Sequence, residues 1–90
     1  MSETTQFQLA DLDAAARLAI HLRQRWAVCV FMRGELTVVA ATLRRERADL
    51  AFLLRTVERW LIDESLGPIA FELDDRLYLL EGQREIAAAA

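Results

Sequence analysis

The sequence predicts a small α+β fold with the element order α-β-β-α-β-β, in which a four-stranded antiparallel sheet carries two helices packed on one face. Two stretches repeat apolar residues at three- and four-residue steps, which is typical of amphipathic helices. Four short runs rich in β-branched and aromatic residues occur in pairs, and each pair surrounds a two-residue turn signal. Ninety residues, 54% of them hydrophobic, suffice for one core, so we expect residues 1–90 to form a single domain.

The chain opens with a polar lead-in over residues 1–8, which we expect to be flexible. A first helix follows from Asp11 to Gln24, with Asp11 as its N-cap and Asp13 spaced to form an ion pair with Arg17. Its apolar stripe consists of Leu12, Ala15, Ala16, Ala19 and Leu22.

The first predicted hairpin joins Trp26–Arg33 to Leu36–Leu43 through Gly34-Glu35, a pair typical of a type II′ turn. A two-residue turn makes opposed residues share a face, so Phe31 should oppose Val38. The face expected to lie under the helices holds Trp26, Val28, Val30, Met32, Val39, Ala41 and Leu43. The other face holds Ala27, Cys29, Phe31, Leu36, Val38 and Ala40, with only Arg33 and Thr42 polar.

A second helix is predicted from Glu46 to Ser65, ended by Gly67 in a left-handed conformation and by Pro68. Its apolar stripe consists of Leu50, Leu53, Leu54, Val57, Trp60 and Leu61. The second hairpin joins Ile69–Leu73 to Arg76–Glu81 through Asp74-Asp75. Residues Ile69, Phe71, Leu73, Tyr78 and Leu80 should face the core, and Ala70, Glu72, Leu77 and Leu79 should lie on the other face. Residues 82–90 are expected to be flexible or to add a short helical turn.

The second face of this sheet lacks the polar alternation expected where a sheet faces water. Two helices cover one face only, so several apolar side chains would stay exposed, as at many interaction sites. We therefore expect a protein-binding or adaptor module that forms a homodimer or binds another polypeptide through this face. The contact residues would be Phe31, Leu36, Val38, Leu77 and Leu79. Two alternatives remain open: a register shifted by one residue, or coverage of the face by the tail or the first helix.

Catalytic machinery is not expected, and neither is a cofactor. His21 and Cys29 are the sole residues of their types, and the carboxylates lack loop spacing, so a metal site would have too few ligands. No nucleophile is implied near His21 on the polar side of the first helix, and no protonated histidine or helix N-terminus is implied beside Cys29 in mid-strand. A single cysteine also excludes an internal disulfide. No apolar run approaches the about 20 residues that span a bilayer, and no secretory signal is evident. These features favour a cytoplasmic protein with no membrane partner.

An arginine cluster suggests a different function. All eleven basic residues are arginine, and Arg44, Arg45 and Arg47 precede the second helix, where they could contact an anion. A small regulatory nucleic-acid-binding module is therefore the alternative. The net charge of −3 argues against general nucleic-acid binding.

The segment Leu50–Glu81 resembles the helix-then-hairpin close of type III secretion chaperone-like domains. The resemblance rests on Leu53-Leu54, Trp60-Leu61, the run from Leu66 through Asp75, and Leu77–Leu80. It implies a small acidic cytoplasmic dimer that holds an extended segment of a client protein. A strand before the long helix and a helix after the last strand, both usual in that family, are missing or vestigial in the predicted order.

Overall fold

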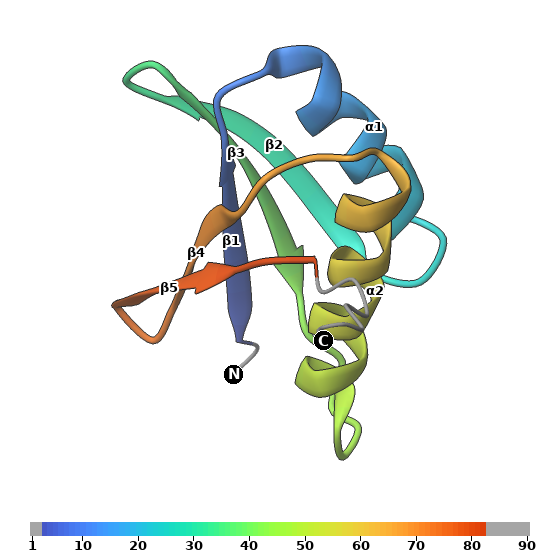
Figure 1. The fold of residues 1–90 in the computed structure, drawn as a ribbon. Coiled ribbons are helices and arrows are strands. Elements are labelled where there is room, and N and C mark those ends of the chain that lie inside the picture. The colour runs from blue at the N-terminus through green and yellow to red at the C-terminus, as the bar shows by residue number, and fades with distance from the viewer. Residues whose placement is uncertain (1–2, 83–90) are drawn as a thin grey trace.

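The computed structural model describes residues 3–82, and its two helices lie on one side of an antiparallel sheet (Figure 1). The elements are β1 (Thr4–Leu9), α1 (Leu12–Leu22), β2 (Ala27–Arg33), β3 (Leu36–Thr42), α2 (Asp49–Asp63), β4 (Ile69–Leu73) and β5 (Arg76–Leu80). The five strands are ordered β2-β3-β1-β4-β5. The α+β class is confirmed with both helices on one face, whereas the four-stranded sheet is wrong because it omits β1.

Strand β1 corrects the expectation that residues 1–8 form a flexible lead-in. It pairs with β3 on one side and β4 on the other, so it is the central strand that joins the two hairpins. The alternation of Thr5, Phe7 and Leu9 with Gln6 and Gln8 explains the strand. The first three side chains are buried, and the glutamines lie on the opposite face.

The first hairpin is confirmed in both its turn and its register. Arg33 opposes Leu36, Phe31 opposes Val38, and Cys29 opposes Ala40. Gly34 has a φ of +64°, the left-handed value that a side chain disfavours and that the first position of this turn requires.

Helix α1 begins as the sequence predicts. The Asp11 side chain accepts a hydrogen bond from the Asp13 backbone N–H at 3.0 Å, which caps the helix. The expected Asp13–Arg17 pair is replaced by a longer-range one, since Arg17 Nη2 lies 3.2 Å from Glu64 Oε1 just beyond α2. This contact links the middle of α1 to the C-terminal end of α2 at the protein surface.

The left-handed residue that ends helix α2 is not the one predicted. Ser65, not Gly67, takes the left-handed conformation, with a φ of +57°. The Ser65 N–H donates to the Ile62 carbonyl and the Leu66 N–H donates to the Leu61 carbonyl. This is the Schellman pattern, and Pro68 follows shortly after it.

The second hairpin turns at Asp74 and Asp75, which both have positive φ values, as a type I′ turn requires. Its expected facing is confirmed, because Phe71 and Leu80 are buried against the helices. The Phe71 ring packs on Tyr78, with centroids 5.2 Å apart, and on Phe7 in β1 at 5.7 Å. The predicted tail lies, from residue 83 onward, outside the described residues.

One hydrophobic core fills the space between the helices and the sheet. Its buried members come from both helices, from the four strands other than β2, and from residues next to β2 and β3: Phe7, Leu9, Ala14, Ala15, Leu18, Ala19, Leu22, Trp26, Val39, Ala41, Leu43, Leu53, Val57, Trp60, Leu61, Phe71 and Leu80. Five expected core positions are exposed instead, and they include Ala16 on α1 and Tyr78 on β5. Leu12 lies at the helix start, while Val30 and Met32 lie on the edge strand β2.

Candidate functional site

The sheet face turned away from the helices is called the open face here. The strand pairings place its side chains in rows that cross all five strands. One row consists of Cys29, Ala40, Gln6, Glu72 and Leu77, and the next consists of Phe31, Val38, Gln8, Ala70 and Leu79. Both rows are apolar toward the edge strands and carry a polar amide at their centre.

The polar centre of the open face comes from β1, which separates the two hairpins. Arg33 reaches from β2 across β3 to this centre. Its Nη2 donates to Gln6 Oε1 at 2.8 Å, and its Nη1 lies 3.2 Å from Glu72 Oε1 on β4. A flat partner that covered the whole face would bury these charged and amide groups, which is costly unless it supplied partners for them.

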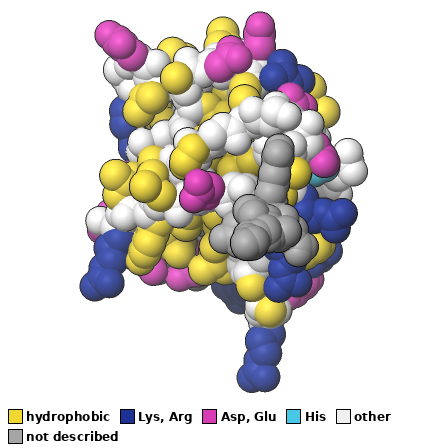
Figure 2. Space-filling view, in the orientation of Figure 1, with side chains coloured by type: hydrophobic (Ala, Val, Ile, Leu, Met, Phe, Trp, Pro, Cys, Tyr) yellow, Lys and Arg dark blue, Asp and Glu magenta, His cyan; other side chains and the backbone are white. Residues whose placement is uncertain are grey.

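The five predicted contact residues all lie on the open face, in two separate groups. Phe31, Leu36 and Val38 belong to the β2–β3 hairpin, and Leu77 and Leu79 belong to β5. Leu79 is 77% exposed and Leu77 is 64% exposed, whereas Val38 is fully buried. Val38 therefore lines the face beneath its neighbours and offers no surface of its own. Figure 2 shows hydrophobic side chains gathered over the β4–β5 hairpin.

Strand β2 presents a second apolar surface that the sequence reading missed. Six of its seven residues are exposed, and within the described residues it pairs with β3 alone. Val30 and Met32 share the face of the helices but are exposed, because the β2–β3 hairpin projects beyond the helices at its turn (Figure 1). Phe31 and the exposed thiol of Cys29 lie on the opposite side of the same strand.

The backbone of β2 also has unpaired groups along its outer edge. In an antiparallel pair, residues alternate between hydrogen-bonded and non-hydrogen-bonded positions. The residues that flank a two-residue turn are hydrogen-bonded, so Arg33, Phe31, Cys29 and Ala27 use their backbone groups toward β3. Those of Val28, Val30 and Met32 point outward. The Val28 carbonyl accordingly accepts from Arg23 Nη2, at 3.4 Å, instead of from β3.

Strand β5 forms the other edge, and its free backbone is shorter. By the same alternation, Arg76, Tyr78 and Leu80 are hydrogen-bonded to β4, so Leu77 and Leu79 carry the outward groups. The strand has five residues against seven in β2. Among the strands that the structure describes, β2 therefore offers the longer pairing edge.

A buried carboxylate that the sequence analysis did not single out holds the residue just before β2 in place. Asp49, the first residue of α2, is buried and accepts hydrogen bonds from Trp26 Nε1 at 2.9 Å and from the Arg44 backbone N–H at 2.8 Å. Arg25 lies 3.5 Å from its other oxygen and packs over the Phe52 ring. Burial alone would raise the pKa of Asp49. The two hydrogen bonds and the Arg25 charge outweigh it, so the pKa is lowered.

The predicted anion-contact residues Arg44, Arg45 and Arg47 lie in the exposed loop between β3 and α2. Arg44 is engaged, since its Nη2 is 3.1 Å from Glu46 Oε2, and Glu46 in turn pairs with Arg25 at 2.9 Å. The Arg44 guanidinium is therefore already paired with a carboxylate of its own loop.

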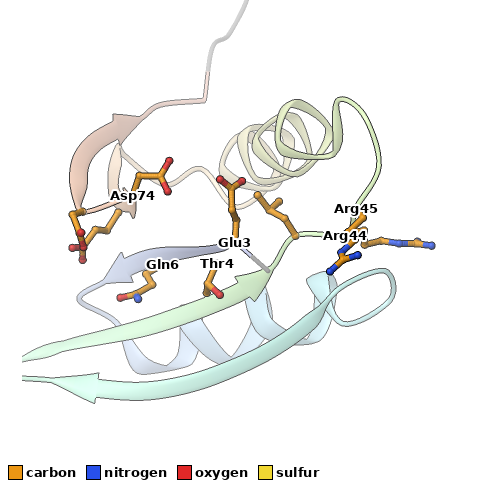
Figure 3. Close-up of a pocket in the computed structure, with 9 residues that line it drawn as sticks. Glu3, Thr4, Gln6, Arg44, Arg45 and Asp74 are labelled. Atoms are coloured by element: carbon orange, nitrogen blue, oxygen red, sulfur yellow. The ribbon is translucent and has the colours of Figure 1, made fainter. Parts of the chain in front are cut away.

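A hollow of about 730 Å³ opens where β1 begins and β3 ends. Figure 3 shows Asp74 on one side of it, Arg44 and Arg45 on the other, and Glu3 between them. Its lining consists of Glu3, Thr4, Gln6, Leu43, Arg44, Arg45, Glu72, Asp74 and Asp75. Opposite charges thus line its two sides.

Neither a metal-ligand cluster, nor a membrane-spanning helix, nor a similar protein assigns a function to the described residues. Among the described residues, no group of three or more histidine, cysteine or acidic side chains is placed to hold a metal ion. No helix in the part of the chain described is long and apolar enough to cross a membrane. The chain matches no protein-family model, no curated protein and no solved structure in the comparisons.

Proposed function

We propose that this chain is a non-catalytic protein-binding module that takes up a polypeptide as an additional strand along the outer edge of β2. The observation that carries the proposal is the combination, on one strand, of outward backbone groups and exposed apolar side chains. Strand addition uses both, because main-chain hydrogen bonds supply affinity and alternate side chains supply specificity.

The edge of β2 lacks the features that usually prevent strand addition. Soluble proteins protect edge strands with lysine, proline, a bulge or an inward-pointing charge. The pairing of β2 with β3 runs without interruption from Ala27 to Arg33, and Arg33 is the strand's single charged residue. An apolar edge of this length is a surface that another strand can join.

Binding along an edge also suits the open face better than a flat sheet-on-sheet contact. An added strand beside β2 would reach Phe31 and Cys29 without covering Gln6 or Glu72 at the centre of the face. It would also match the extended client segment implied by the resemblance to type III secretion chaperone-like domains. The nucleic-acid alternative is weaker, since Arg44 is already paired with Glu46.

A labelled peptide with the sequence of residues 23–35, carrying serine in place of Cys29, tests the proposal by fluorescence anisotropy. The wild-type chain should bind it with micromolar affinity. Val30→Arg, which places a charge at the centre of the edge, should abolish binding. Ile20→Arg is the matched control, because Ile20 is exposed on α1 and lies outside the sheet.

Circular dichroism would establish that both variants are folded. Absence of peptide binding to the wild-type chain at any concentration would contradict the proposed function. Equal binding by folded Val30→Arg would contradict the assignment to β2.

A further inference from the structure

We propose that the strand which occupies the β2 edge is β2 of a second copy of this chain, paired antiparallel about a twofold axis at Val30. The inference rests on the proposed function and names its partner. The two sheets would join into one continuous sheet, and the helices of both copies would lie on the same side of it.

The outward backbone groups restrict the register of this pairing, and the axis at Val30 gives the longest overlap that uses all three of them. They belong to Val28, Val30 and Met32, so these residues must form the hydrogen-bonded pairs. With the axis at Val30, Val28 faces Met32 of the second copy, and the two Val30 residues face each other. Each pair exchanges two hydrogen bonds, and the overlap includes every residue of Ala27–Arg33.

The side chains are self-complementary in the same register. On the helix side, Val30 packs against Val30 and Met32 packs against Val28. On the open face, Phe31 lies opposite Cys29 and Arg33 lies opposite Ala27. The exposed apolar surface of Val30, Phe31 and Met32 would therefore be covered by apolar groups, and no two charges of the same sign would be opposed along the strand.

Charges beyond the strand ends support the same arrangement. A residue and its counterpart have numbers that sum to 60 in this register, so Glu35 in the turn of one copy lies near the segment that precedes β2 in the other, which carries Arg23 and Arg25. Arg23 takes part in no ion pair among the described residues. Its guanidinium now contacts the Val28 carbonyl. In the dimer, the Met32 N–H would take over that carbonyl, and Arg23 would be free to meet Glu35.

The size of the contact sets the expected affinity. Two seven-residue strands side by side bury less than the about 1,200–2,000 Å² of a typical stable complex. We therefore expect a dimer that dissociates at micromolar concentrations. The outward backbone of β2 is longer than that of β5, where only Leu77 and Leu79 carry groups free to pair with another strand. We therefore expect β2 to be the preferred edge.

Disulfide trapping tests both the partner and the register. Phe31→Cys places a thiol opposite Cys29 of the second copy, in a non-hydrogen-bonded pair. The Cα atoms of such a pair are about 4.5 Å apart, within the range of a disulfide. Mild oxidation with diamide should give a covalent dimer of Phe31→Cys on a non-reducing gel.

Two controls distinguish this register from others. In the wild-type chain the two Cys29 residues would be offset by two positions, about 8 Å apart, beyond disulfide range. In Cys29→Ser/Phe31→Cys the two new thiols are offset in the same way. Neither should form the covalent dimer at concentrations at which Phe31→Cys does.

Sedimentation velocity of the wild-type chain completes the test. A concentration-dependent dimer that Val30→Arg abolishes, together with trapping of Phe31→Cys, is the expected result. A chain that stays monomeric but still binds the residue 23–35 peptide would overturn the second-copy proposal and leave the proposed function intact. Efficient trapping of the wild-type chain through Cys29 would overturn the register, because it requires an axis at Cys29.

Discussion

Replacing Asp49 with alanine should destabilise the fold by about 3 kcal/mol, because three segments depend on its carboxylate. Asp49 accepts from the indole N–H of Trp26, which precedes β2, and from the backbone N–H of Arg44, which follows β3. It also lies next to the Arg25 guanidinium. The substitution leaves the first two donors without an acceptor.

The magnitude follows from these contacts. A hydrogen bond to a charged group contributes about 1.5–3 kcal/mol. Trp26 is buried, so its N–H incurs most of that loss, whereas the N–H of Arg44 is only partly buried and can bind water. Arg25 keeps its contact with Glu46, so it adds little. A loss of about 3 kcal/mol is a large share of the 5–15 kcal/mol that is typical of small domains.

Urea unfolding followed by far-ultraviolet circular dichroism measures the effect without relying on Trp26 fluorescence. With a slope of about 1 kcal/mol per molar urea, the midpoint should fall by about 3 M. A double-mutant cycle with Trp26→Phe isolates the indole bond. The double variant should be less destabilised than the sum of the single variants by about 1.5 kcal/mol. Strict additivity, or a loss below about 1 kcal/mol for Asp49→Ala, would refute this account of the contact.

Three further predictions concern the same fold. Because the folded-state pKa of Asp49 lies below its ordinary value of 3.8, its carboxylate stabilises the protein above that pH and stops doing so as the pH falls through the folded pKa. The difference in free energy of unfolding between the wild type and Asp49→Asn should therefore become smaller from pH 7 to pH 3, and a difference that stays constant would contradict the lowered pKa of Asp49. Ser65→Gly should raise the melting temperature by several degrees, since Ser65 holds a left-handed φ of +57° that glycine adopts without strain; no gain would argue against that conformation. Gly82→Ala should lower it, because the added Cβ would lie 2.8 Å from Ile62 Cγ1 and 3.2 Å from the Glu58 carbonyl oxygen; an unchanged melting temperature would show that this approach is not close.

The two hairpins could be predicted in detail because their information is local. Gly34 supplies the positive φ that its turn needs, and Asp74 and Asp75 tolerate it in theirs. Once a two-residue turn is placed, the register and the facing of every side chain follow. The exposure of Leu77 and Leu79 on the open face was predictable for this reason.

Strand β1 could not be placed by the same local reasoning, because both of its pairings are long-range. The alternation of Phe7 and Leu9 with Gln6 and Gln8 was the available signal, but it is short and lies in a polar terminus. Without β1, the open face was expected to be largely apolar, with Arg33, Thr42 and Glu72 as its polar residues, and its amide centre was missed.

The edge position of β2 depends on the same long-range pairing. Val30 and Met32 have the facing expected of core residues, and nothing in their own segment indicates that the helices leave them exposed. The burial of Asp49 is equally non-local, since its main partner Trp26 lies 23 residues earlier. Long-range contacts, not local propensity, thus decide which surface is available for binding.

Amide hydrogen exchange at increasing protein concentration tests the role of the β2 edge most directly. The amides of Val28, Val30 and Met32 point outward, so they should exchange rapidly in the dilute monomer and become protected as the chain associates. The outward amides of Leu77 and Leu79 on β5 should not change. Protection confined to β5, or β2 amides that exchange at the same rate at every concentration in a chain that demonstrably associates, would contradict the account.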